Sequence, residues 1–167
     1  MRNTLVKVGL STAAAVLLMS SSAYAQATAT ASLNVTVNVA ARARLTLGAA
    51  SITFADQDPA TVPTLTAGAL TVDVGARTAP ASNVTLTVLA TGDLTSGGNT
   101  IPVTTLAWTA SGAGFAAGAS SAAVAQSVGT WTGPGARSGT QTYTLPNSWT
   151  YAVGTYTTTL NYTLTAP

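Results

Sequence analysis

Apolar and polar residues alternate with a period of two along much of the chain, and this pattern constrains the fold more than any other feature. The longest alternating run lies near the N-terminus, over residues 27–39, and carries four large aliphatic side chains: Leu33, Val35, Val37 and Val39. Similar alternation recurs over residues 70–74, 84–88 and 156–165, where threonine occupies most of the polar positions. Successive side chains of a β-strand point to opposite faces, so such segments predict antiparallel strands with one buried face.

Turn-forming residues interrupt these segments about every ten residues. Examples are Asp56–Pro59, Gly133–Gly135 and Pro146–Ser148. The Ala-rich stretch 116–125 could form a single helical turn, but its glycines and serines argue against a longer helix. Many short strands separated by turns are typical of a β-sandwich or barrel. We therefore expect one all-β domain over residues 26–167, an immunoglobulin-like antiparallel β-sandwich.

The first 25 residues have the composition of a secretory signal peptide. Arg2 and Lys7 precede an apolar run, Val8–Met19, and the small-residue triplet Ala23–Ala25 then provides a cleavage site before Gln26. A membrane anchor is the alternative, but the apolar run is shorter than the ~20 residues that a bilayer span requires. The mature chain is therefore expected to be secreted, to the extracellular space or the cell surface, with no membrane span after cleavage.

The composition excludes most catalytic chemistry. The chain has no cysteine and no histidine, and its only acids are four aspartates: Asp56, Asp58, Asp73 and Asp93. Thiol nucleophiles, imidazole bases and soft metal ligands are therefore absent. Asp56-x-Asp58 could ligate calcium, yet the loop lacks further acids, and a turn before Pro59 is the simpler interpretation. We expect no enzyme activity, no catalytic residues, no cofactor and no metal.

The charge balance also limits the partners. Once residues 1–25 are removed, four arginines (Arg42, Arg44, Arg77 and Arg137) balance the four aspartates, so the net charge is zero. A neutral chain has no electrostatic basis for binding nucleic acid. A charge-poor surface favours self-association or packing against other neutral material. Without cysteine, the stability of a secreted domain must come from its core and its sheets.

Aromatic residues gather in the C-terminal sixty residues. They are Trp108, Trp131, Tyr143, Trp149, Tyr151, Tyr156 and Tyr162. Exposed aromatic rings on a sandwich could stack against sugar rings, whereas buried rings would fill the core. Tyr156 and Tyr162 fall on the apolar face of their segment, and core packing is therefore the preferred interpretation for most of this set.

The C-terminal segment resembles the last strand of WxL-type bacterial cell-surface domains. Those domains close with a Gly-x-Tyr-x-x-x-Leu-x-aromatic-x-Leu strand, and the matching residues here are Gly154, Tyr156, Leu160, Tyr162 and Leu164. Ile52–Phe54 and Leu70–Asp73 are also similar to that family, although Val84-Thr85-Leu86 stands where it carries Trp-x-Leu. The resemblance implies a non-catalytic β-sandwich module that associates with cell-wall polymer or other surface proteins.

The same final segment also resembles the last strand of chaperone–usher pilins and spore-coat-U-like proteins. The alternating run 27–39 is unusually long for a mature N-terminus. Such a run could add itself as a strand to a neighbouring subunit, with Leu33, Val35, Val37 and Val39 filling its groove. The alternative is an ordinary first strand in its own sheet, which is the preferred interpretation at this point.

Two functions therefore stay open. The first expectation is a secreted, WxL-like structural module of the cell envelope, and the alternative is a self-assembling, pilus-like filament subunit. The C-terminal core strand is common to both, whereas an assembly strand at residues 27–39 belongs to the second alone.

Overall fold

The computed structural model describes residues 27–167, so the expected signal peptide lies outside the described residues. The elements are almost all strands: β1 (Arg42–Leu47), β2 (Thr64–Thr66), β3 (Leu70–Arg77), β4 (Asn83–Ala90), β5 (Leu94–Ser96), β6 (Asn99–Ile101), β7 (Ala107–Ser111), β8 (Gly118–Ala119), β9 (Gln126–Thr132), β10 (Gly135–Pro146) and β11 (Leu160–Thr165). One short 3-10 helix, Val103–Thr105, is the sole helical element in the described part. The expected all-β class is therefore confirmed.

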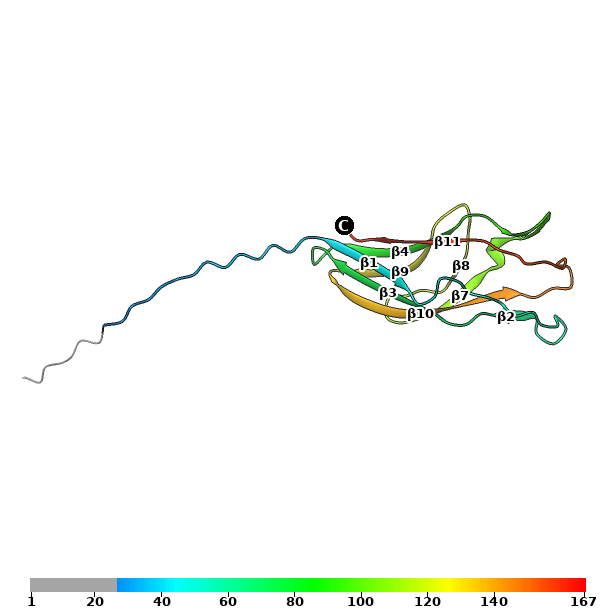
Figure 1. The fold of residues 1–167 in the computed structure, drawn as a ribbon, viewed down its shortest axis with the longest axis horizontal. Helices are drawn as coiled ribbons and strands as arrows, with labels where there is room; N and C mark the ends of the chain where they lie inside the picture. The colour runs from blue at the N-terminus through cyan, green and yellow to red at the C-terminus, as the bar shows by residue number, and fades with distance from the viewer. Residues whose placement is uncertain (1–26) are drawn as a thin grey trace, which may run out of the picture. The chain divides into compact units, whose positions relative to one another are not determined.

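The larger sheet has the order β1-β3-β10-β7-β8, and all of its pairings are antiparallel. β10 is its longest strand. Residues 135–141 of β10 pair with β3, and residues 144–146 pair with β2. The second sheet has the order β11-β4-β9, also antiparallel, and β5 and β6 form a separate hairpin. The two sheets form the layers of a sandwich (Figure 1).

The core lies between these layers and follows the alternation of the sequence. In β3 the residues Leu70, Val72 and Val74 are buried, and in β4 every second residue from Val84 to Ala90 is buried. The alternate positions, which include three threonines, stay at least partly accessible. Burial of the apolar face is the driving force that makes these segments strands.

Two sequence expectations about strand limits are wrong. The run 27–39 is not a strand of its own sheet, because β1 begins only at Arg42. The final strand begins at Leu160, and Gly154 and Tyr156 lie before it. Just before Leu160 the chain runs beside the β4–β5 turn, where Thr158 Oγ1 donates to the Gly92 carbonyl. The one β-bridge in this segment joins Thr157 to Thr95. The backbone is thus held there by irregular bonds instead of a ladder.

Residues 38–167 form one compact unit, and residues 27–37 belong to a second unit. No helix within residues 27–167 is long and apolar enough to cross a membrane. The stretch 116–125 forms the two-residue strand β8 and loop, and no helical turn.

Candidate functional site: an open groove between the sheet edges

A groove of about 1400 Å³ opens along one edge of the sandwich. One wall is the segment Ala49–Asp58, which continues from β1 without joining a strand, and the other is the segment Ser148–Leu160, which leads into β11. Apolar side chains of the larger sheet, of the β5–β6 hairpin and of the loop before β7 form much of its floor, and all but the first are buried: Leu65, Leu70, Leu94, Ile101, Leu106, Tyr143 and Leu145. The groove therefore lies directly against the core of the sandwich.

The strands beside the groove are incompletely buried. Inward-facing residues of the central strands, such as Val72 and Leu86, have no exposed surface. The inward-facing residues of β1 and β11 are only half-buried although they pack against the core: Leu45, Leu47, Leu160, Tyr162 and Leu164. Ile52 and Phe54 on the groove wall are half-buried as well. The sandwich thus lacks cover along this edge.

Backbone groups at the groove are also free to pair. Among the described strands, β11 pairs only with β4 and β1 pairs only with β3, so each has one edge without a hydrogen-bonded partner strand. Such edges present unpaired N–H and C=O groups that another strand can bind. Leu47 of β1 and Leu160 of β11 both line the groove. The site therefore combines apolar pockets with the backbone donors and acceptors that an added strand needs.

A hydroxyl network joins the groove to the buried interior. The Tyr162 hydroxyl donates to Gln141 Oε1 at 2.6 Å, and the hydroxyls of Tyr143 and Tyr162 are 2.6 Å apart. Because the Tyr162 proton is committed to Gln141, Tyr143 must be the donor in the second bond. Burial raises the pKa of Tyr143 far above its usual value and also raises the pKa of Tyr162. Both phenols are therefore neutral, and the network fixes β11 to β10 across the two layers.

The run considered as an alternative assembly strand, residues 27–39, is exposed. Leu33 is 87% exposed, and Val35, Val37 and Val39 are between 68% and 77% exposed. Residues 27–41 belong to no strand of the described chain. An alternating aliphatic run left in water is a liability unless another surface covers it, because exposed apolar side chains favour association.

Most of the clustered aromatic residues serve the core. Trp108 and Tyr143 are buried and their ring centroids lie 5.8 Å apart, while Trp131 packs edge-on against Phe115. The indole N–H groups of Trp108 and Trp131 donate to the carbonyls of Ala116 and Ala113. Trp149 differs, because it is 75% exposed on the groove wall.

The aspartates hold turns. Asp58 Oδ1 accepts the Ala60 N–H at 2.8 Å, and the Asp58 carbonyl accepts the N–H groups of Thr61 and Val62, so the turn lies over residues 59–61 and not before Pro59 as expected. Asp93 Oδ1 accepts the Val103 N–H at 2.8 Å. Within residues 27–167, no three acidic side chains come together as a possible metal site.

Sequence reasoning did not identify the groove walls. Ile52 and Phe54 alternate with polar residues and signal a half-buried extended segment, but nothing in that pattern indicates that the segment lacks a partner strand. The wall at Ser148–Gly154 has no periodicity and carries no such signal. Comparison with known proteins adds nothing here, since no protein-family model and no curated protein matches the chain.

Proposed function

We propose that this protein is a secreted, non-catalytic structural subunit that assembles into extracellular filaments. Each subunit inserts its N-terminal run, residues 27–39, into the groove of the next subunit. The observation that carries the proposal is the coexistence of an unfilled groove with free strand edges and an exposed alternating run in the same chain. The inserted run completes an immunoglobulin-like sandwich with a strand from a neighbour.

The chemistry of the run matches that of the groove. Inserted beside β11, the run would pair its backbone with the free strand edge and point every second side chain at the floor. The inward side chains would be Leu33, Val35, Val37 and Val39. Burying four aliphatic side chains at ~1.5–3 kcal/mol each contributes roughly 6–12 kcal/mol before ordering costs. That gain is sufficient to hold a polymer together.

Secretion fits the same proposal. The leader at residues 1–25 would direct export, and the mature chain would then begin at Gln26, one residue before the run. Mass spectrometry of exported material should give Gln26 as the first residue. A free N-terminus is what insertion into a neighbour requires.

The envelope-module function rests only on the WxL resemblance of the C-terminal segment, Ile52–Phe54 and Leu70–Asp73. It would leave both the exposed aliphatic run and the open groove without an occupant. The filament function gives each of these features a partner, and for this reason it is the better supported of the two.

Electron microscopy of the purified mature protein tests the proposal, with ordered filaments as the expected result. Val37→Asn, which places an amide on the groove-facing side of the run, should abolish the filaments. Thr36→Asn is the matched control, because its side chain would point away from the groove, and it should leave them intact. A wild-type protein that stays monomeric at high concentration would refute the proposal.

A further inference from the structure

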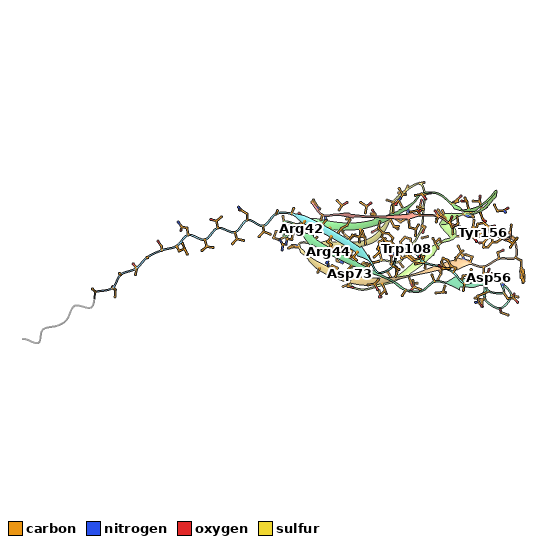
Figure 2. The ribbon with its side chains drawn as sticks, in the orientation of Figure 1. Arg42, Arg44, Asp56, Asp73, Trp108 and Tyr156 are labelled. Carbon is orange, nitrogen blue, oxygen red and sulfur yellow. The ribbon has the colours of Figure 1, made fainter. Side chains whose placement is uncertain are left out.

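Six of the eight charged side chains of residues 38–167, the four arginines and two of the aspartates, are segregated along the sandwich. Arg42 lies opposite Arg77, Arg44 lies opposite Gly75, and Arg137 lies opposite Val74, so all four arginines occupy one end of the larger sheet. Asp56 and Asp58 lie at the other end, and Figure 2 shows Arg42 and Arg44 far from Asp56.

Strand β10 gives the scale of this separation. It runs from the arginine end to Pro146, and the next residue, Asn147, donates to the Gln57 carbonyl between the two aspartates. Ten residues separate Arg137 from Asn147, which corresponds to about 33 Å of strand. The Debye length at physiological salt is about 8 Å, so the two ends do not neutralise each other within one molecule.

The arginine end is electrostatically unfavourable by itself. Arg42 and Arg77 are both exposed and directly opposite each other across β1 and β3, and like charges in that position are destabilising. Asp73, the one acid on this sheet, is instead opposite Thr46. An anionic surface brought against this end would relieve the repulsion.

The aspartate end is the mouth of the groove. Asp56 and Asp58 are exposed and line the groove. β1 and β11 contact each other, and Leu47 is the residue of β1 that lines the groove, so the groove does not reach the arginine end of that strand. A strand from another molecule therefore enters beside the aspartates.

We propose that this charge polarity orients head-to-tail assembly, with the arginine end of one copy against the aspartate mouth of the next. The inference rests on the proposed filament function and adds the direction of insertion. Val39 then lies nearest the mouth and Leu33 lies deeper. Arg42 is only three residues beyond Val39, about 10 Å of extended chain, and therefore meets the acidic rim.

Charge reversal at each end tests this junction. Variant A carries Arg42→Asp and Arg44→Asp, and variant B carries Asp56→Arg and Asp58→Asn, in which the asparagine keeps an acceptor for the Ala60 N–H. Alone, each variant brings like charges together, and its polymerisation at low salt should be slower than wild type by about tenfold or more. Mixed, they restore opposite charges at every junction, so alternating copolymers should form at the wild-type rate.

Light scattering and electron microscopy of the full mature chains provide the readout. Asp73→Asn is the control: it removes an acid beside the arginine end without bringing like charges together at the junction, so it should not slow polymerisation. The differences should vanish near 1 M salt, where the Debye length is about 3 Å. Variants that polymerise alone as fast as wild type at low salt, or that fail to copolymerise, overturn the polar junction. A wild-type chain that forms no polymer overturns the filament function itself.

Discussion

At the residue scale, the Tyr143–Tyr162–Gln141 network is the most specific polar feature of the interior. Gln141 is fully buried, and its Nε2 has no hydrogen-bond partner in the described structure. Its Oε1 accepts a hydrogen bond from the Tyr162 hydroxyl. A buried acceptor that loses its only donor costs about 1–3 kcal/mol. This network therefore couples the edge strand β11 to the centre of β10.

Removing the Tyr162 hydroxyl should destabilise the protein. We expect Tyr162→Phe to lower the free energy of unfolding by about 1–3 kcal/mol, because Gln141 Oε1 and the Tyr143 hydroxyl both lose their partner. Tyr156→Phe is the matched control, since its hydroxyl bonds to the exposed Ala152 carbonyl. Chemical denaturation measures the free energy of unfolding of each variant. An equal effect of the two substitutions would contradict the network's role.

The same network predicts how stability varies with pH. Burial raises the pKa of Tyr143 and Tyr162 in the folded chain, whereas an unfolded tyrosine titrates near pH 10. The folded state therefore holds both protons longer, so stability is fully present below about pH 10 and decreases as the pH rises further. Thermal unfolding from pH 8 to 11 should show this decline, and it should be smaller in Tyr143→Phe. A flat profile in the wild type would contradict it.

At the scale of the element, β11 is a core strand on one face and a groove wall at its edge. Leu160 is half-buried and packs against the core, whereas Thr159 is exposed. We expect Leu160→Ala to cost about 2 kcal/mol, the lower end of the range for buried leucine, and Thr159→Ala to be nearly neutral. Urea denaturation of both variants provides the comparison. Equal costs would mean that the inward face is assigned one residue out of register.

The sequence predicts the central elements better than the edges, for a physical reason. In β3 and β4 the alternation of Leu70–Val74 and Val84–Val88 corresponds to strands of the structure. Their apolar faces are buried in the core, and their other faces stay at least partly accessible to solvent. Residues 27–39 carry the same alternation but form no strand. Period-two patterning indicates which face must be covered, and it does not indicate whether the cover comes from the same chain.

At the scale of the whole molecule, the groove could not be predicted from the sequence. Its walls, at residues 49–58 and 148–160, are about 100 residues apart in the chain, and the space between them depends on how two sheets close at one edge. The segregation of charge is likewise invisible in the sequence. Arg137 joins Arg42 and Arg77 only because β3 pairs with both β1 and β10.

Deleting residues 26–39 separates assembly from folding in one experiment. Residues 38–167 form a compact unit without residues 26–37, and its first strand, β1, begins at Arg42. The truncated chain should therefore fold with an unchanged monomer unfolding midpoint. It should form no filaments, because the donated strand is gone while the groove stays open. A synthetic peptide of residues 27–39 should bind the groove and raise the midpoint in a concentration-dependent way, as any ligand specific to the folded state does. The same peptide with Val35→Asn and Val37→Asn should bind far more weakly. If truncation instead lowered the monomer midpoint and the peptide had no effect, the run would be packing within its own chain, and the donated-strand assembly would be refuted.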